Sequence, residues 1–163
     1  MKTLLVMRHA KSSWRDDNLA DHDRPLNKRG RRDAPRMAKL LVDESLTPNL
    51  IISSTALRAV RTAEAVADEG GYQIELEFRR DLYLAAAEAS IETLRDFAGD
   101  AAIVMLVGHN PGMEELVHDL HGDYMRMPTA AIAHVQLPIE NWSELDEATE
   151  GKLAHLWRPK ELP

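Results

Sequence analysis

The stretch Leu4-Leu5-Val6-Met7-Arg8-His9-Ala10 decides the fold class of this chain. It begins with an apolar run short enough for one buried strand, and the charged pair Arg8-His9 follows at once. Comparable apolar runs recur along the sequence and alternate with longer segments of helical period. That alternation is typical of a parallel sheet with crossover helices, which places the chain in the α/β class.

The other apolar runs predict the remaining elements. Strands are expected at residues 50–52 and 74–78, at 102–107 as the central buried strand, and near the sheet's edge at 131–137 and 153–157. Helices are expected at 29–44, capped by Asn27, at 56–69, ended by Gly70-Gly71, at 90–97, capped by Ser90, and at 112–120. Without an internal repeat or a linker, residues 1–163 are expected to form a single domain.

The overall charge limits the possible partners. The chain has 20 Lys and Arg residues against 27 Asp and Glu residues, a net charge of −7. Because nucleic-acid binding needs a basic face, this balance argues against nucleic acid as a partner. A phosphate site in such a chain has to be a local cationic pocket. The absence of cysteine excludes disulfides, thiolate catalysis and Cys-based zinc sites.

Two features bear on location. The longest apolar run, residues 101–107, is far too short to span a bilayer. Met1-Lys2-Thr3 leads directly into the first expected strand, with no apolar region of a signal peptide. We therefore expect a cytoplasmic protein with no membrane partner.

Polar residues follow three of the expected strands. Arg8-His9, Ser53-Ser54 and Gly108-His109 all stand at carboxyl ends, which is the edge where open α/β sheets bind ligands. Two of these positions lead into helices, whose free amide groups favour anions. Arg58, about one turn into the second helix, is placed to point back over the same edge.

Phosphoryl transfer is the chemistry that this set of side chains suits. The reaction needs a positioned nucleophile and positive charge around three equatorial oxygens. A neutral imidazole supplies the first, and the planar fork of arginine supplies the second at any working pH. The convergence of two histidines and two arginines therefore predicts a phosphoryl-transfer site.

Three blocks of the sequence resemble the signature blocks of the histidine phosphatase, or phosphoglycerate-mutase-like, superfamily. They are LLVMRHA at 4–10, STALRAVRTA at 54–63 and VGHNP at 107–111. Ala10 stands where the family more often has glycine. Further segments resemble its SixA-type phosphohistidine phosphatase branch, namely DRPL at 23–26, KRG at 28–30 and WRPK at 157–160. The resemblance extends over the whole chain.

The resemblance implies a fold and a set of roles. The fold is a three-layer α/β/α sandwich with a mostly parallel central sheet. His9 would attack phosphorus and become transiently phosphorylated. Arg8, Arg58 and His109 would surround the phosphoryl oxygens, and Arg24 would reach in as a further clamp from the loop after the first strand.

This chain lacks one catalytic group that the family's larger phosphomonoesterases and mutases have. They carry a carboxylate general acid after a middle strand, where this chain reads LYLAAA at 82–87, with only Asp81 and Glu88 beside it. An alkoxide leaving group needs such an acid, which contributes about 100- to 10,000-fold. Imidazole leaves more easily than an alkoxide, so phosphorus–nitrogen substrates are favoured. The short stretch 79–100 leaves little chain for a lid, and an open pocket admits a protein-borne phosphohistidine.

The sequence thus predicts a phosphohistidine phosphatase that needs no metal or cofactor. Its partner would be a phosphorelay or phosphocarrier protein, which implies a role in signal transduction. A small-molecule phosphomonoesterase of the same superfamily remains an alternative, with Asp81, Glu88 or a substrate group as the acid. A non-catalytic phosphohistidine-binding module is another, although the intact set of arginines and histidines speaks against it.

Other polar clusters are interpreted as having no part in the chemistry. Asp21-x-Asp23 resembles the aspartyl nucleophile of haloacid-dehalogenase phosphatases, but it follows a polar loop where that chemistry needs a strand end. His22 is given no role. Surface ion pairs with Glu64 or Asp68 are the alternative for Arg58, and solvation is the alternative for Arg24. The basic run Lys28, Arg29, Arg31 and Arg32 predicts a solvated face, with contact to an acidic protein as the alternative.

Overall fold

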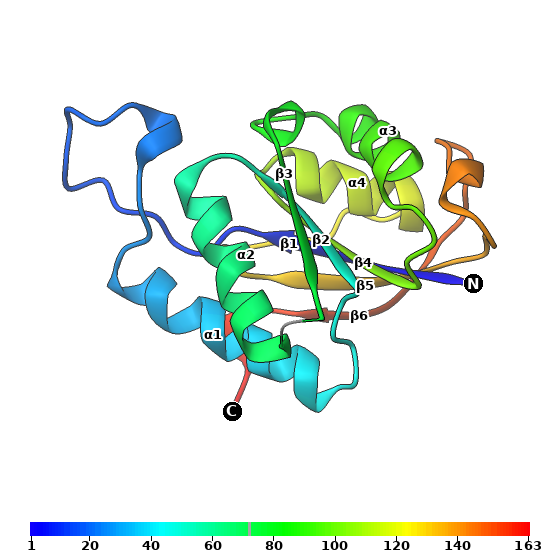
Figure 1. Ribbon diagram of the computed structural model, residues 1–163, viewed down its shortest axis with the longest axis horizontal. Coiled ribbons are helices and arrows are strands. Elements are labelled where there is room, and N and C mark those ends of the chain that lie inside the picture. Colours follow the sequence, from blue (N-terminus) through cyan, green and yellow to red (C-terminus); the bar gives the residue numbers. More distant parts are fainter. Residues whose placement is uncertain (72) are drawn as a thin grey trace.

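The computed structural model describes residues 1–71 and 73–163, and a six-stranded sheet lies at its centre (Figure 1). The strands are β1 (Lys2–Arg8), β2 (Leu50–Ser54), β3 (Glu75–Arg79), β4 (Ile103–Gly108), β5 (Ile132–Leu137) and β6 (Lys152–Trp157). Their order in the sheet is β3-β2-β4-β1-β5-β6. The first four of these strands run parallel, and β5 and β6 pair antiparallel. The predicted, mostly parallel sheet is confirmed.

Helices cover both faces of the sheet. They are α1 (Lys28–Asp43), α2 (Leu57–Gly70), α3 (Ala87–Phe97) and α4 (Gly112–His121). Figure 1 shows α1 and α2 on one side and α3 and α4 on the other. The three-layer α/β/α sandwich expected from the resemblance is therefore confirmed. No helix among the described residues is both long and apolar enough to cross a membrane.

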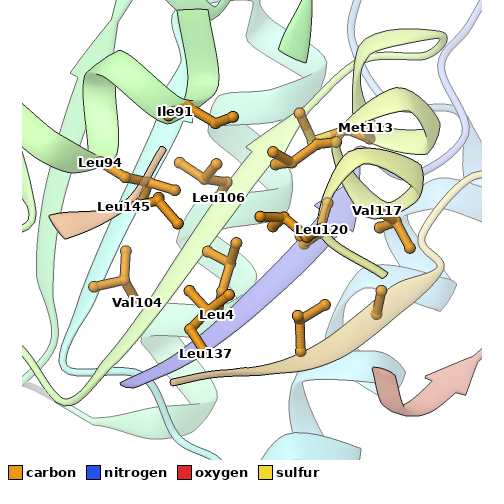
Figure 2. Close-up of a cluster of buried hydrophobic side chains, with 14 of the residues drawn as sticks. Leu4, Ile91, Leu94, Val104, Leu106, Met113, Val117, Leu120, Leu137 and Leu145 are labelled. Carbon is orange, nitrogen blue, oxygen red and sulfur yellow. The ribbon is translucent and has the colours of Figure 1, made fainter. Parts of the chain in front are cut away.

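Strand β1 shows how one apolar run serves two cores. Successive side chains of a strand point to opposite faces, so Leu4 and Val6 pack on the side of α3 and α4. Leu5 and Met7 pack on the side of α1 and α2. Figure 2 shows the first of these cores, where Leu4 lies among side chains from α3, α4 and β4. Burial on both faces explains why the strand is continuously apolar.

The helix ends follow local signals in two cases and not in a third. Asn27 caps α1 as predicted, its Oδ1 accepting from the amide of Gly30 at 2.9 Å. Gly71, just after α2, has a left-handed φ of 105° that suits glycine. The predicted cap at Ser90 is wrong, because α3 begins at Ala87 and the Ser90 hydroxyl is buried without a partner among the described residues. Packing of the helix's apolar face outweighs the capping preference of serine there.

The sheet order brings three strand ends together. Strands β1, β4 and β2 are adjacent and parallel, and their registers pair Arg8 with Gly108 and Ser53 with Val107. Their carboxyl ends therefore lie at one edge of the sheet. The segment between β1 and α1 turns through a short 3-10 helix, Asp21–Asp23, which contacts α2 beside that edge.

Candidate active site

The structure brings together all five residues that the sequence singled out. Arg8 ends β1 and His9 follows it, Arg58 lies in the first turn of α2, and His109 follows β4. Arg24 comes directly after the 3-10 helix. All five line one pocket of about 290 Å³. The rest of its lining includes Lys11, Ser12, Trp14, Leu84, Asn110 and Thr129.

His9 is buried and presents one free ring nitrogen. Its Nδ1 lies 2.8 Å from the carbonyl oxygen of Ala10. Because a carbonyl oxygen only accepts, Nδ1 carries the proton and Nε2 keeps its lone pair. Burial, together with the nearby His109, Arg58 and Arg8, lowers the pKa of His9 to about 3. The ring is therefore neutral near pH 7, with Nε2 available as a nucleophile.

His109 is held by two neighbours. Its Nε2 lies 2.8 Å from the hydroxyl of Ser54, and its Nδ1 lies 3.4 Å from a guanidinium nitrogen of Arg58. Guanidinium only donates, so Nδ1 accepts and Nε2 donates to Ser54. Burial, together with the charge of Arg58, lowers the pKa of His109 to about 4. Because both histidines are neutral, the arginines and Lys11 supply the positive charge of the pocket.

Arg58 points into the pocket and not along the helix surface. Its side chain is 4% exposed, and it donates to both the main-chain oxygen and the carboxylate of Asp21, at 2.7 and 3.0 Å. The helix-surface alternative is wrong, since Glu64 pairs with Arg61 at 2.7 Å. The buried guanidinium instead faces the two histidines of the site.

Thr62 explains the spacing of the second sequence block. Its hydroxyl accepts from the amide of Ala10 at 3.0 Å and donates to the carbonyl oxygen of Arg58 at 2.8 Å. These bonds join the first turns of α2 to the residue after His9. Ala10 is fully buried and has no left-handed φ, so its methyl group is accommodated where the family more often has glycine.

Arg24 is buried at the pocket, and the alternative of a solvated loop residue is wrong. Its Nε donates to the carbonyl oxygen of Ser13 at 3.0 Å, and its two terminal nitrogens donate to Asp21, at 2.8 Å, and to the hydroxyl of Ser12. The guanidinium carbon lies 3.2 Å from the centre of the Trp14 ring. Such stacking suits the planar guanidinium of arginine.

Arg8 directly precedes His9 in the chain and is only partly buried. Its Nη1 donates to the carbonyl oxygen of Met127 at 3.2 Å. No carboxylate of the described residues forms an ion pair with it, so its charge remains available to an anion. Burial lowers the pKa of Arg8, although the nearby charge of Glu114 opposes that shift.

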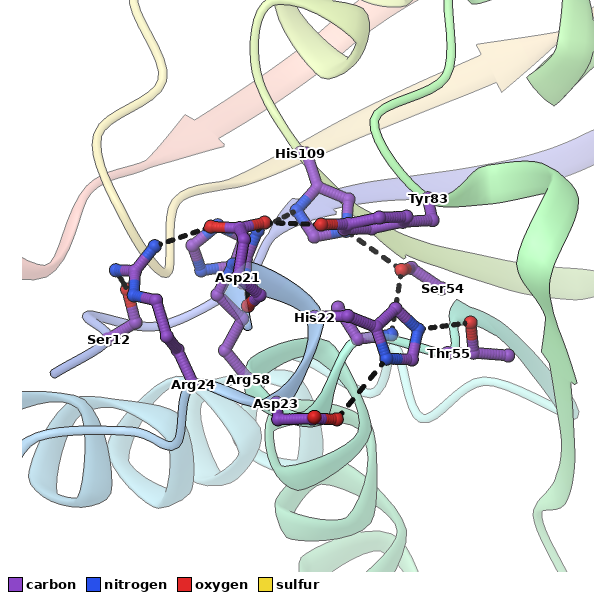
Figure 3. A network of polar contacts seen from close by, with 12 residues as sticks. Ser12, Asp21, His22, Asp23, Arg24, Ser54, Thr55, Arg58, Tyr83 and His109 are labelled. Atoms are coloured by element: carbon purple, nitrogen blue, oxygen red, sulfur yellow. Dashed lines mark hydrogen bonds and ion pairs between the residues drawn. The ribbon is translucent and has the colours of Figure 1, made fainter. Parts of the chain in front are cut away.

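Asp21 is a member of the site that the sequence analysis dismissed. Its carboxylate binds Arg24 and Arg58 and accepts from the hydroxyl of Tyr83 (Figure 3). The Tyr83 hydroxyl, together with the two guanidinium groups, holds the pKa of Asp21 well below its usual range. Asp21 is therefore ionised and fixes both arginines. No strand end or motif marked it, because the contact depends on how the loop after β1 folds.

Two aromatic rings were also missed. Tyr83 packs edge-on against His109, with ring centres 5.5 Å apart, and its hydrogen bond to Asp21 raises its pKa. His22, for which no role was expected, bonds to Thr55 at 2.8 Å and packs edge-on against Tyr83. Tyr83 therefore lies between His109 and His22, and it connects His109 to the 3-10 helix that contains His22 (Figure 3).

The two candidate acids lie outside the pocket. Asp81 is 71% exposed and pairs with Arg79 at 3.3 Å, and Glu88 is exposed at the start of α3. Within the part of the chain that the structure describes, Asp21 is the one carboxylate that pairs with a pocket arginine, and it is ionised. The same residues contain no group of three or more His, Asp or Glu side chains placed to hold a metal ion.

Comparisons with known proteins identify the family. The model of the histidine phosphatase superfamily, branch 1, matches residues 4–83. An uncharacterized chloroplastic protein of Arabidopsis thaliana is 34% identical over 88% of this chain and 70% of its own length. An uncharacterized protein of Mycobacterium tuberculosis is also 34% identical, over 64% of this chain and 63% of its own.

Solved structures place the chain within that family. The SixA protein of Agrobacterium tumefaciens is 28% identical, with a TM-score of 0.81 over 97% of this chain and 98% of its own. The protein histidine phosphatase SixA complexed with tungstate is 25% identical, with a TM-score of 0.83 over 99% of both chains. The chain therefore belongs to the histidine phosphatase superfamily, in its SixA-type branch, and this membership supports a phosphatase.

The family also contains relatives with other activities. A 2,3-bisphosphoglycerate-dependent phosphoglycerate mutase of Thermobifida fusca is 33% identical over 44% of this chain and 30% of its own. A mycobacterial glucosyl-3-phosphoglycerate phosphatase shares the fold, with a TM-score of 0.70 at 16% identity. Family membership thus leaves the substrate to be argued from the site.

Proposed function

We propose that this phosphatase hydrolyses phosphohistidine on a cytoplasmic phosphorelay or phosphocarrier protein, through a phosphorylated His9 and without a metal ion. One observation carries the proposal. Neutral His9 presents Nε2 among the arginines of the pocket, and the carboxylate that pairs with two of these arginines, that of Asp21, is ionised. A site of this kind can attack phosphorus, but it has no carboxylic acid ready to protonate an alkoxide.

In the first step, the lone pair on Nε2 of His9 forms a bond to phosphorus and the phosphorus–nitrogen bond of the substrate breaks. A substrate imidazole that is already protonated on its other nitrogen keeps the bonding pair and leaves as a neutral ring. No proton has to come from the enzyme. The departing phosphoryl group is received by a ring whose Nδ1 proton is held by the Ala10 carbonyl.

In the second step, a water oxygen forms a bond to phosphorus and the bond to Nε2 breaks. Phospho-His9 carries the same Nδ1 proton, so it too leaves as a neutral imidazole and the resting state returns. The proton lost by water departs with inorganic phosphate or to solvent. The hydrogen bond to Ala10 therefore makes His9 both a good nucleophile and a good leaving group.

The arginines supply the charge that metal ions provide in many other phosphoryl-transfer sites. Arg8, Arg24 and Arg58 line the pocket together, and guanidinium groups bind phosphoryl oxygens through paired hydrogen bonds. The similar SixA structure is complexed with tungstate, a tetrahedral oxyanion like phosphate, which supports an oxyanion-binding site in this fold. This use of arginine supports the proposed metal independence.

The mouth of the pocket favours a protein over a small metabolite. Trp14 and Leu84 line it and are 70% and 58% exposed. Large apolar side chains exposed beside a polar pocket are typical of protein contact surfaces. A phosphohistidine-bearing protein can contact these apolar side chains, whereas a small, polar sugar phosphate would gain little from them.

Turnover assays test the proposal directly. The enzyme, treated exhaustively with EDTA, is given a phosphohistidyl phosphocarrier protein and, separately, p-nitrophenyl phosphate and a sugar phosphate. We expect rapid release of phosphate from the protein alone, and a phosphoryl group on His9 when the reaction is quenched in alkali and mapped by mass spectrometry.

Other outcomes select the alternatives. Preference for the sugar phosphate would identify a small-molecule phosphomonoesterase. Binding of the phosphohistidyl protein without turnover would identify a non-catalytic binding module. Activity that EDTA abolishes and one divalent ion restores would refute metal independence.

A further inference from the structure

A second cationic hollow adjoins the catalytic pocket. This basic cleft has a volume of about 740 Å³ and is lined mainly from three segments of the chain, α1, residues 126–129 and residues 158–161, with Arg8, Lys11, Asn110 and Glu114 beside them. Its cations include Lys11, Arg29, Arg32, Arg126, Arg158 and Lys160. They outnumber its carboxylates, although the chain as a whole has a net charge of −7. The cleft is therefore a local concentration of positive charge.

The carboxylates of the basic cleft are already engaged. Asp33 is buried beside Arg29 and Arg32, at 3.8 and 3.3 Å. Glu161 pairs with Arg158 at 3.1 Å. The third, Glu114, accepts from the main-chain amide of residue 127 at 2.7 Å.

Other cations of the cleft have no such neutralisation. Within the described residues, no carboxylate lies within 4.0 Å of a side-chain nitrogen of Lys11, Arg126 or Lys160. Arg126 and Lys160 are also exposed. Their charges are therefore free to meet an anion brought by another molecule.

Hydrogen bonds to uncharged groups join the three segments of the cleft. Arg29 donates to the hydroxyl of Thr129 at 3.2 Å, and Arg36 donates to the carbonyl oxygen of Pro159 at 3.0 Å. Arg158 donates through Nε to the carbonyl oxygen of Arg126 at 3.0 Å. Neutral acceptors orient a guanidinium without cancelling its charge, so the surface is ordered and still cationic.

The basic cleft is continuous with the catalytic pocket. Arg8, Lys11, Asn110 and Thr129 line both. Arg8 is the last residue of β1 and precedes His9, so the chain that carries the nucleophile also borders the cleft. A molecule whose phosphoryl group enters the pocket would lay its neighbouring surface over the cleft.

We propose that the basic cleft docks an acidic segment of the phosphohistidyl protein substrate. Aspartate and glutamate side chains near the phosphohistidine would meet Lys11, Arg126 and Lys160. The cleft is far larger than one phosphate group requires, and it is continuous with the pocket that the exposed Trp14 and Leu84 line, so its size and position fit a protein surface. This inference rests on the proposed function and adds how the substrate is selected.

Docking of this kind should affect how fast and how tightly the protein substrate binds to the enzyme. Exposed charges steer an oppositely charged partner and are screened by salt, while they leave the chemical step unchanged. Loss of two such charges should therefore raise KM for the protein substrate by roughly tenfold at low ionic strength, as expected for about 1.4 kcal/mol. kcat should not change.

The test compares two double variants on two substrates. Arg126→Ser with Lys160→Ser removes two cations of the cleft, and Arg61→Ser with Lys39→Ser removes two exposed cations elsewhere on α2 and α1. Each enzyme is assayed at low and high ionic strength with a phosphohistidyl phosphocarrier protein and with phosphoramidate. We expect only the cleft variant to show a raised KM, only on the protein, and with a weaker dependence on salt than the unchanged enzyme.

Each other result overturns a defined part of the proposal. An unchanged KM on the protein would show that the cleft does not dock it, while the proposed function stands. An equal rise of KM on phosphoramidate would show that these cations act on the phosphoryl group itself. An enzyme that turns over phosphoramidate but no phosphohistidyl protein would refute the proposed function, and docking with it.

Discussion

The catalytic pocket and the basic cleft lie side by side and both rely on arginine, yet they hold it differently. In the pocket, the side chains of Arg24 and Arg58 are 8% and 4% exposed, and one ionised carboxylate, that of Asp21, fixes both. In the cleft, the Arg32 side chain is 68% exposed, and Arg29 and Arg158 bind neutral oxygens as well as the carboxylates of Asp33 and Glu161. Buried and fixed positive charge is suited to stabilising the transition state of phosphoryl transfer, whereas exposed positive charge is suited to attracting a charged protein partner.

The difference sets the size of the effects to be expected in each region. Charges removed from water interact strongly with a phosphoryl group held among them. An exposed ion pair contributes about 0–1 kcal/mol and weakens with salt. Substitutions in the pocket should therefore lower kcat by large factors, and those in the cleft should change KM by small ones.

The largest effect is expected at His9. His9→Ala removes the nucleophile and should reduce turnover by roughly a million-fold, as for nucleophile loss in other enzymes. The fold should remain, because β1 is held by strands on both sides. Single-turnover assays and a search for the phosphoenzyme by mass spectrometry measure the loss. The cleft double variant serves as the control and should keep its phosphoenzyme; substantial turnover by His9→Ala would assign the nucleophile to another residue.

The next effect separates buried from exposed arginine on one helix. Arg58→Lys keeps the charge but loses the planar fork, so kcat/KM should fall by about 1,000-fold, within the range for an arginine aimed at transition-state charge. Arg61→Lys, at an exposed position on α2, should be nearly neutral. Steady-state kinetics on a phosphohistidyl protein measure both. Near-normal kinetics for Arg58→Lys would remove Arg58 from the site.

The catalytic pocket was largely predictable from sequence because its parts sit at ends of regular elements. Apolar runs located β1, β2 and β4, and the carboxyl ends of parallel strands meet at one edge. His9 and His109 therefore had to converge. The start of α3, at Ala87, was missed because apolar packing from Ala87 onward outweighs the capping preference of Ser90.

The remaining parts depend on contacts between distant segments. Asp21 reaches Arg58 only because the loop after β1 folds back over α2, and no local pattern of period or motif encodes that path. The basic cleft joins α1 to residues 126–129 and 158–161. From sequence, the run Lys28–Arg32 predicted a solvated charged face and not a cleft, because the segments that complete the cleft lie far along the chain. Arg29 and Thr129, which share a hydrogen bond, are 100 residues apart.

A smaller effect tests the anchor that distinguishes the pocket from the cleft. Asp21→Asn keeps an acceptor for Arg24 but removes the charge that fixes both guanidinium groups, so kcat should fall roughly tenfold, the order of one charge-assisted hydrogen bond. Loss of the nearby negative charge should tighten inhibition by inorganic phosphate about fivefold, in line with about 1 kcal/mol of Coulomb energy. Kinetics with phosphate as inhibitor measure both. An unchanged kcat would show that Asp21 does not position the arginines.

The histidines of the catalytic pocket should make the stability of the folded protein depend on pH. His9 and His109 have pKa values of about 3 and about 4, so neither should titrate between about pH 5 and 8 in NMR spectra of the folded protein, unlike the histidines of the urea-unfolded chain near 6.5. Because the unfolded state binds these protons first, stability should fall as pH drops below about 6.5, by roughly 1–2 kcal/mol per histidine at pH 5.

A substitution assigns that loss of stability. His9→Asn should show a weaker fall in the free energy of unfolding between pH 7 and 5 than the unchanged protein, as measured by denaturant titration. An equal fall in both proteins would show that other groups are responsible.

The smallest effect concerns Leu84, at the mouth of the pocket. Leu84 has a left-handed φ of 52°, which costs a non-glycine residue about 1–2 kcal/mol, and its exposed side chain recovers little of that cost by burial. Strain of this kind often marks a functional position. Leu84→Gly should therefore be more stable than Leu84→Ala by about 1 kcal/mol, less than the full strain because glycine gains freedom in the unfolded chain. Both variants should raise KM for a phosphohistidyl protein by about threefold through loss of one apolar contact, and leave phosphoramidate kinetics unchanged. An unchanged KM on the protein would confine docking to the cleft.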